Sequence, residues 1–308
     1  MTILDAPDET IAGPAGASAV RVGDAIADRS PAAPPARRFG SFDRAMIRTI
    51  VAKDVAAARR SKAVVIPMLV VPFVLLVGLP TGLGLFARAG AAPDLSGVLD
   101  HLPSSLRADL LALPPKQQVI QLVLGYLIAP LFLIVPMMIS SALAADTFAG
   151  EKERRTLESL LHLPVETRDL YVAKVLFAFL PTVAASWIGF TLFAVSANVV
   201  SWPVMHHLFI PTWRWVGLIG FMAPAVAALG LGVMVRVSAR ARTTQEANQL
   251  GGAVIMPLIL ASVGQTTSLL MMKPYWIFVA GAVVWTLALI LIRGGLARFD
   301  RDRVASRL

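Results

Sequence analysis

Six of the eight residues from Glu151 to Glu158 are charged, in a 308-residue chain in which charged residues make up only 15 %. Residues 151–162 are good helix formers, and Glu151 and Arg155 have the spacing that pairs opposite charges on one helix face. Gly150 can end the preceding helix, and Pro164 prevents this one from continuing. Three leucines add an apolar cluster: Leu157, Leu160 and Leu161. The pattern predicts a short charged helix with an apolar knob that a soluble partner could grip, or else a solvated connecting helix.

The rest of the chain is too apolar for a water-soluble protein. Hydrophobic residues make up 56 % of it and the mean hydropathy is +0.71, whereas soluble domains carry about 25 % charged residues. The absence of cysteine excludes disulfides, cysteine zinc sites, iron–sulfur clusters and a thiol nucleophile. The composition therefore predicts an integral membrane protein.

Six long uncharged windows supply the membrane spans, because a spanning helix needs about 20 apolar residues and must satisfy its own backbone. We predict an all-α polytopic membrane protein whose six-span domain, residues 63–295, has helices near 63–87, 118–145, 169–200, 214–236, 246–270 and 274–293. The window after Lys174 is too short for two spans and a turn. Residues 201–213, which include Trp202, Pro203 and Trp213, are predicted to form a membrane-surface loop, with a re-entrant segment as the alternative.

The distribution of Lys and Arg sets the orientation. With the N-terminus in the cytoplasm, 23 of the 28 basic residues lie on the inner side and 5 on the outer side. Cytoplasmic loops carry this excess in membrane proteins, so both termini are predicted to be cytoplasmic in a multi-pass protein of the inner (cytoplasmic) membrane. The net charge of +9 is thus mainly a topology signal. A role in nucleic-acid binding is not expected, because no basic groove with interleaved aromatic residues is evident.

Four segments flank the spans. Residues 1–40 are rich in Ala and Pro and are predicted to be a disordered cytoplasmic tail, and residues 296–308 form a second cytoplasmic tail. Residues 41–62 predict an amphipathic helix, either lying in the membrane interface or extending the first span. The external loop 88–117 predicts a short helix capped by Ser104 or Ser105 and stopped by Pro114 and Pro115. This loop is either passive or a contact for an extracytoplasmic partner.

The string from Glu151 to Val165, E-K-E-R-R-T-L-E-S-L-L-H-L-P-V, resembles the signature of ABC type-2 transporter permeases. In that family the pattern is roughly E-K/R-E-x-G-T-L-E-x-L-L-x-x-P-V/I, followed by a span with an early Gly-Lys. The present chain departs at Arg155, where the family commonly has Gly, and at Ala173, which precedes Lys174. The resemblance covers about residues 40–308, with one specific motif and a general six-span topology.

The resemblance implies a transporter subunit without a catalytic site of its own. Such permeases pair with a second copy or a paralogue and bind two separate ATPase subunits, which hold ATP and Mg. Residues 151–162 would be the coupling helix, and the loop from Arg236 to Glu246 a smaller contact. The expected ATPase contacts are Glu151, Lys152, Glu153, Arg154, Arg155, Thr156, Leu157, Glu158, Leu160, Leu161 and Pro164. The chain has no GxxxxGK(S/T) phosphate loop, so no cofactor is expected in it.

Analogy with the family indicates an exporter of an amphiphilic or hydrophobic substrate, such as a drug, a lipid or a peptide. The substrate-binding residues stay unknown from sequence. Cation extrusion or the maturation of external metalloproteins is an alternative with the same fold, and Met205, His206 and His207 would then matter. No metal site is predicted there, because adjacent histidines usually point apart. A membrane enzyme or scaffold without ATP coupling is the third reading.

Overall fold

The computed structural model describes the chain in blocks separated by short gaps: residues 44–60, 66, 69–70, 72–89, 97, 100, 102–153, 167–271 and 275–305. Every regular element within these blocks is helical. The first 43 residues, which include the predicted tail, lie outside the described residues, so the prediction of disorder is not tested.

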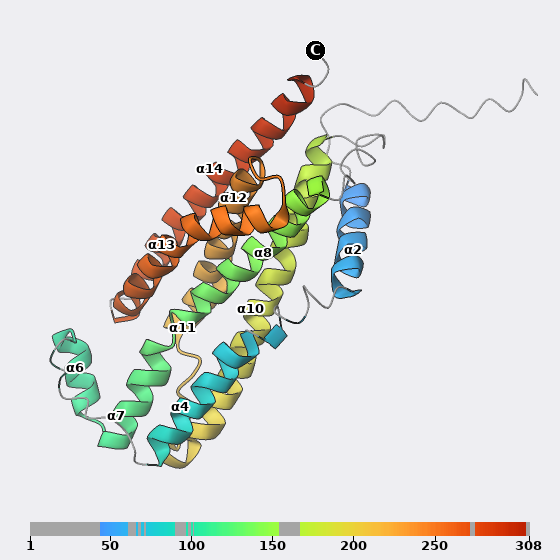
Figure 1. Cartoon of the computed structure of the whole chain (residues 1–308). Coiled ribbons are helices and arrows are strands. Elements are labelled where there is room, and N and C mark those ends of the chain that lie inside the picture. The colour runs from blue at the N-terminus through green and yellow to red at the C-terminus, as the bar shows by residue number, and fades with distance from the viewer. Residues whose placement is uncertain are drawn as a thin grey trace, which may run out of the picture. The chain divides into compact units, whose positions relative to one another are not determined.

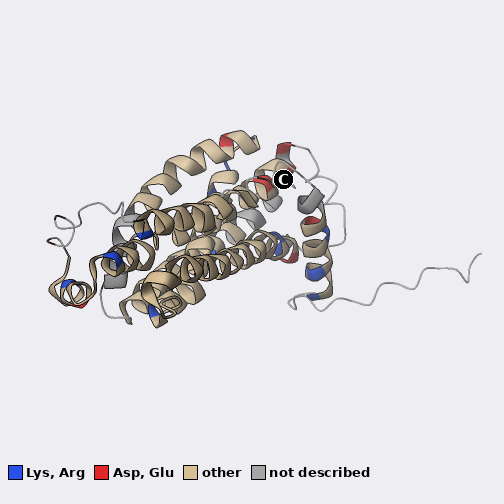
Figure 2. Cartoon of the chain, turned by 90° about the horizontal axis from the view of Figure 1, so that it is seen from below, with Lys and Arg blue, Asp and Glu red and all other residues tan. Residues whose placement is uncertain are grey.

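Four stretches of the described chain are long and apolar enough to cross a membrane: Pro115–Glu151, Arg168–Met205, Trp213–Ser238 and Tyr275–Leu296. They coincide with the second, third, fourth and sixth predicted spans. Figure 2 shows long stretches of helix with neither acidic nor basic residues. The chain is therefore a multi-pass membrane protein.

The other two predicted spans are not among these four stretches. The region of the first contains a shorter apolar helix, Val74–Arg88, and several residues before it lie outside the described blocks. The region of the fifth is helix α13, Thr244–Met271, with Pro257 in its interior. Six spans and the cytoplasmic location of the termini stay predictions.

Three of the membrane helices contain a π-helical segment. These are η1 (Val74–Gly78) before α4 (Leu79–Arg88), η2 (Val123–Leu127) after α7 (Pro115–Leu122), and η3 (Leu218–Met222) between α11 (Trp213–Gly217) and α12 (Ala223–Ser238). A proline follows each segment by two or three residues: Pro80, Pro130 and Pro224. Proline has no N–H to donate to the carbonyl four residues earlier, and in each case that carbonyl lies inside the π segment. The backbone hydrogen bonds there therefore shift to the wider π-helical turn.

Helix α12 forms the centre of the bundle and packs against α8 (Leu131–Glu153) and α14 (Tyr275–Ala305) (Figure 1). From Ala223 to Val235 it is apolar all round, which is typical of a helix buried on every side. Gly230 faces α8, where a Cβ would lie 3.0 Å from the Met137 carbonyl oxygen, and Gly232 faces α14, where a Cβ would lie 2.8 Å from the Leu291 Cβ. Small residues thus allow close helix contact on two sides of α12.

The long helix α10, Thr167–Met205, packs on α8 and on the amphipathic helix α2, Arg44–Arg60. The end of this helix differs from the prediction. We predicted an end near Val200, but Trp202 and Pro203 lie within the helix, and residues 206–212 form the loop. Pro203 is tolerated because it lies in the final turn, where only one backbone bond is lost. Val55 of α2 packs against the core of the bundle, as an apolar stripe requires.

Two predicted helix ends also differ from the structure. Helix α8 continues through Gly150 to Glu153, because this glycine provides close contact with Thr244 and not a left-handed turn. Helix α6, Ser104–Leu111, has Pro103 at its N-cap without a side-chain hydrogen bond, so neither serine caps it. Pro115 begins α7, where the missing N–H costs nothing, and the predicted stop at Pro114 and Pro115 is confirmed.

Candidate functional site

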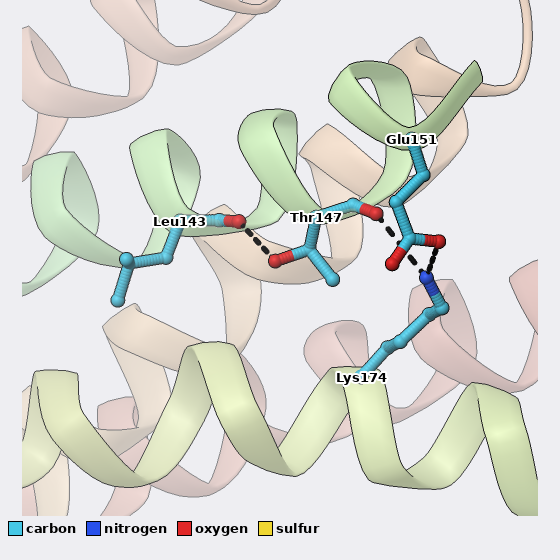
Figure 3. A network of polar contacts seen from close by, with 4 residues as sticks. All are labelled: Leu143, Thr147, Glu151 and Lys174. Atoms are coloured by element: carbon cyan, nitrogen blue, oxygen red, sulfur yellow. Dashed lines mark hydrogen bonds and ion pairs between the residues drawn. The ribbon is translucent and has the colours of Figure 1, made fainter. Parts of the chain in front are cut away.

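Lys174 lies in the second turn of α10 and is 1 % exposed. Its ammonium group forms an ion pair with the Glu151 carboxylate of α8 and donates a hydrogen bond to the Thr147 carbonyl oxygen at 3.3 Å (Figure 3). An unpaired ammonium group at this depth would carry a large desolvation cost, so these two acceptors are what allow a lysine to be buried here. The pair joins the end of α8 to the start of α10.

The turn of α8 around this lysine is held by its own side chains. The Thr147 hydroxyl donates to the Leu143 carbonyl oxygen at 2.6 Å, and the Phe148 ring centroid lies 5.9 Å from the Lys174 ammonium nitrogen. An aromatic face at this distance attracts a cation. The ammonium group is therefore surrounded by one turn of α8, from Thr147 to Glu151.

A third ionisable group, Asp54 of α2, interacts electrostatically with Lys174 and Glu151. Burial raises the pKa of the Asp54 carboxyl above its ordinary value, and the nearby Glu151 carboxylate adds to the rise, while Lys174 and Lys53 oppose it. Asp54, Glu151 and Lys174 thus form a cluster, here called the charged junction, built from α2, α8 and α10.

Glu153, two residues beyond Glu151, ties α8 to α13. Its carboxylate accepts hydrogen bonds from the backbone N–H and the hydroxyl of Thr244, each at 2.9 Å. A carboxylate at a helix N-terminus is favourable because it meets unpaired N–H groups and the positive end of the helix dipole. Next to this contact is an open polar hollow of about 720 Å³ lined by Asp146, Glu153, Thr244, Gln245, Asn248 and Gln249.

The start of α13 also has a local cap. The Glu246 backbone N–H donates to the Thr243 hydroxyl at 3.1 Å, and the Arg242 backbone N–H donates to the Glu246 carboxylate at 2.7 Å. This is close to a capping box, with the acidic side chain reaching one residue further back. The loop Arg236–Glu246, predicted as a second partner contact, therefore has a defined end.

Helices α10 and α12 are joined to α14 by bonds to backbone carbonyls. The Tyr171 hydroxyl donates to the Ile292 carbonyl oxygen at 2.7 Å, and the Arg236 guanidinium donates to the Leu291 carbonyl oxygen at 3.3 Å. Both contacts need the adjacent Gly294 and Gly295, since a Cβ there would lie 2.3 Å from Arg236 and 2.6 Å from the Tyr171 oxygen. The charged end of α8 is thereby linked, through α10 and α12, to the last span.

Of the predicted ATPase-contact residues, the structure describes only those at the start of the segment. Glu151 and Glu153 belong to the end of α8 and make the contacts above, while the side chain of Lys152 is not described. The others lie outside the described residues: Arg154, Arg155, Thr156, Leu157, Glu158, Leu160, Leu161 and Pro164. The predicted coupling helix and its Glu151–Arg155 pair therefore stay predictions.

The sequence reasoning missed Asp54 and Thr244. The signal for Asp54 was its position four residues after Ile50 and beside Val55, where an acidic residue interrupts the apolar stripe of α2. Nothing local marked Thr244 as the partner of a residue 91 positions away.

Met205, His206 and His207 do not converge on one point. Met205 is 3 % exposed, both histidines are exposed, and the His207 Nδ1 atom lies 2.7 Å from the Met205 carbonyl oxygen. Within the described residues, no cluster of three or more His, Cys, Asp or Glu side chains could hold a metal ion.

Comparison with protein families gives one match over most of the chain. The family model described as ABC-2 family transporter protein matches residues 48–294, which include the motif segment, the charged junction, three of the four apolar spans and all but the last two residues of the fourth. No curated protein and no solved structure matches the chain. Permeases of this family are transmembrane subunits that lack an ATPase domain of their own and generally work with ABC ATPase subunits. The chain belongs to the ABC-2 family of transporter proteins, as the motif at 151–165 predicted.

Proposed function

We propose that this protein is the transmembrane permease subunit of an ATP-driven exporter in the cytoplasmic membrane. Two permeases would pair, two ABC ATPases would bind on the cytoplasmic side, and residues 151–162 would form the coupling helix that the ATPases grip. The cargo would be an amphiphilic or hydrophobic molecule. Support comes from the family match, from the 23 basic residues on the side of this segment, and from the contacts that surround it.

The observation that carries the proposal is the ion pair between Glu151 and Lys174. Residues 154–166 connect α8 to α10, and the pair joins these two helices just outside the connection. A force on a flexible connection between independent helices would be absorbed by the connection. Because the helices are bound to each other at its base, a displacement of the segment would move both helices as a unit.

The contacts of α8 give that displacement a route into the bundle. Glu153 holds the start of α13, and α8 packs along α12, which in turn packs on α14. Packed helices shift between discrete arrangements more readily than they deform. Movement at the Glu151–Lys174 pair would therefore reposition the central helix, which is how ATP-driven closure of the ATPases would open a path for cargo.

No bond-making chemistry is required of this chain. ATP and Mg would be held by the partner ATPase, whose phosphate loop supplies the groups that this sequence lacks. The chain contributes a binding surface for the ATPase and a rigid connection from that surface to the membrane helices.

Cysteine cross-linking tests the proposed contact, because the chain has no natural cysteine. A Ser159→Cys permease would be co-expressed with a candidate ABC ATPase that carries one cysteine in its surface groove. We expect a disulfide-linked permease–ATPase pair whose yield changes with ATP. Ser104→Cys on α6 is the matched control and should give no cross-link. A permease that never retains an ATPase, or that cross-links equally from both positions, would refute the proposal.

Coupling itself is tested with Leu157→Asp, which places a charge in the apolar knob, against the exposed Leu208→Asp in the loop after α10. The first change should keep membrane insertion but abolish cargo-stimulated ATP hydrolysis by the reconstituted complex, because the ATPase can no longer seat the knob. The second should leave the stimulation unchanged. Full stimulation in Leu157→Asp would show that this segment does not couple the subunits.

A further inference from the structure

A small cavity lies at the other end of the span that leads to the charged junction. It has a volume of about 260 Å³ and is formed by the end of α7 and by η2, by the loop before α11, and by the first residues of α11. We call it the outer pocket. Its lining residues are Gln121, Gly125, Tyr126, Phe209, Thr212, Trp213, Arg214 and Trp215.

One ring of the outer pocket's aromatic wall, that of Trp215, is fixed by packing, whereas Trp213 is exposed. Trp215 is 2 % exposed, and its ring centroid lies 5.2 Å from that of Phe132, 5.5 Å from that of Phe190 and 5.4 Å from that of Phe193. Aromatic pairs at these separations attract one another beyond the effect of burial. The Trp215 ring is already held in place, so it loses little conformational freedom when a ligand binds.

The loop that closes the outer pocket is held by Asn198 of α10. Its side-chain amide donates to the Ile210 carbonyl oxygen, and its side-chain oxygen accepts from the Phe209 backbone N–H at 3.1 Å. The loop is therefore pinned to the end of α10 immediately before Trp213 and Arg214. The pocket is a formed feature of the fold and not a gap between mobile segments.

The polar side chains of the outer pocket have hydrogen-bond donors that no other described residue accepts from. The Arg214 guanidinium donates to the Tyr126 hydroxyl at 3.1 Å, and within the described residues no carboxylate pairs with it. A guanidinium has five N–H donors, so most of its donor capacity is left over. The Gln121 side-chain amide likewise makes no hydrogen bond to any part of the chain that the structure describes. The half-buried position of Arg214 strengthens its attraction for an anion, because water screens it less.

We propose that the outer pocket binds the anionic head group of an amphiphile, with Arg214 on the anionic oxygens, Gln121 and Tyr126 as further donors, and the rings of Trp213 and Trp215 on the first carbons. Drug-sized ligands occupy about 300–1,000 Å³, so a cavity of about 260 Å³ suits a head group and its adjacent carbons. The rest of the apolar chain lies outside the pocket, along the apolar span. Guanidinium groups are well suited to phosphate and carboxylate because they can donate two parallel bonds. This binding needs no ATPase and is independent of the coupling proposed above.

The test uses the full chain in nanodiscs of phosphatidylcholine. The probe is decyl phosphate with a photoreactive diazirine on its second carbon, and the labelled peptides are mapped. We expect labelling in residues 121–126 or 209–215. Unlabelled decyl phosphate should compete at least about tenfold better than decyl phosphocholine, because the charge of the latter head group is already neutralised. Inorganic phosphate should compete poorly, because it leaves the aromatic wall unused.

Two independent changes examine the pocket. Arg214→Gln removes the charge, with Lys116→Gln at an exposed position of α7 as the control. Gly125→Leu fills the cavity, since a Cβ there meets only the Gln121 Cγ at 3.9 Å, and Gly220→Leu is the matched control because a Cβ at that π-helical glycine meets nothing within 4 Å. We expect at least about a tenfold loss of site labelling in both pocket variants and none in the controls.

Three outcomes would overturn the proposal: labelling that ignores the head-group charge, wild-type labelling in both pocket variants, or equal competition by inorganic phosphate. Repeating the labelling in nanodiscs with phosphatidylglycerol separates two sources of the same chemistry. A fall in labelling identifies an anionic lipid of the bilayer as an occupant, and unchanged labelling identifies a free single-chain amphiphile. Because the wild-type chain alone decides between charged and neutral head groups, a variant that fails to fold does not remove the test.

Discussion

The two ends of the span Pro115–Glu151 treat charge in opposite ways. At the charged junction, the buried Lys174 is matched by the Glu151 carboxylate and by a backbone carbonyl, and Glu153 beside it is matched by Thr244. In the outer pocket, Arg214 has one hydroxyl partner and no carboxylate among the described residues. Matched charges hold helices together, whereas an unmatched cation beside an open cavity is free to bind a ligand. One helix thus combines a rigid mechanical end with an end suited to recognition.

The largest expected contrast follows from removing one charged group at each end. Glu151→Ala leaves the 1 %-exposed Lys174 without its counter-ion and should destabilise the protein by about 3–5 kcal/mol. Arg214→Gln removes a half-buried group with a single hydrogen bond and should cost about 1 kcal/mol. Thermal unfolding of the detergent-solubilised chain, followed by tryptophan fluorescence, measures both.

Equal losses in the two variants would contradict the contrast between the two ends. A larger loss in Arg214→Gln would show that the outer pocket is the structural end of the span. Lys116→Gln on α7 supplies the baseline for the loss of an exposed charge.

Replacing both partners at once separates stability from coupling. The double variant Glu151→Gln with Lys174→Met removes both charges and keeps similar side-chain volumes, so it should recover most of the stability that Glu151→Ala loses. Without the ion pair, the base of the 154–166 connection is held by weaker contacts. We therefore expect normal ATPase binding but a reduced cargo-stimulated rate of ATP hydrolysis in the reconstituted complex.

The reverse exchange, Glu151→Lys with Lys174→Glu, is the control for this result. It restores an ion pair of opposite direction and should recover part of the stimulation. Stimulation that is unchanged in the uncharged double variant would show that the Glu151–Lys174 pair is structural only.

Much of the fold was predictable because it depends on composition. Uncharged windows located the four long apolar helices, since lipid imposes one solution on any apolar segment of that length. The motif at 151–165 identified the family correctly. The helical character of residues 44–60 followed from the spacing of Met46, Ile50 and Val55.

The features that sequence reasoning missed depend on tertiary contacts. The rule for residues four apart directed attention to Glu151 with Arg155, a pair that stays a prediction, and nothing in that rule pointed to Lys174, a partner of Glu151 that is 23 positions away. Gly150 was interpreted through its backbone freedom, yet its role is close contact with Thr244. The π segments could have been anticipated, because each proline that follows one removes the N–H that its turn would have used.

Glycine substitutions examine the same contrast at a smaller scale. A Cβ at Gly150 would lie 3.1 Å from the Asp146 carboxylate and 3.2 Å from the Thr244 hydroxyl, which Glu153 already holds. A Cβ at Gly125 meets only the Gln121 Cγ at 3.9 Å. Gly150→Ala should therefore cost about 1 kcal/mol, whereas Gly125→Ala should gain up to about 1 kcal/mol, since alanine favours the helical backbone. Thermal unfolding of the two single variants measures the signs, and a gain in both would show that the α8–α13 contact is loose.

The smallest expected effect is the pH dependence that Asp54 adds to the charged junction. Burial raises the pKa of the Asp54 carboxyl in the folded protein above its value in the unfolded chain. Between these two pKa values the folded state binds more protons, so this contribution to stability is present at low pH and is lost as pH rises through the raised pKa. Asp54→Asn should therefore be more thermally stable than wild type at pH 8, and its advantage should shrink towards pH 4.5.

Asp54 is partly exposed, so solvent screening keeps the difference in stability small. Asp109→Asn at an exposed position of α6 controls for the loss of an aspartate as such. An advantage that grows on acidification would mean that attraction to Lys174 outweighs burial, and that the charged junction has three matched charges instead of two.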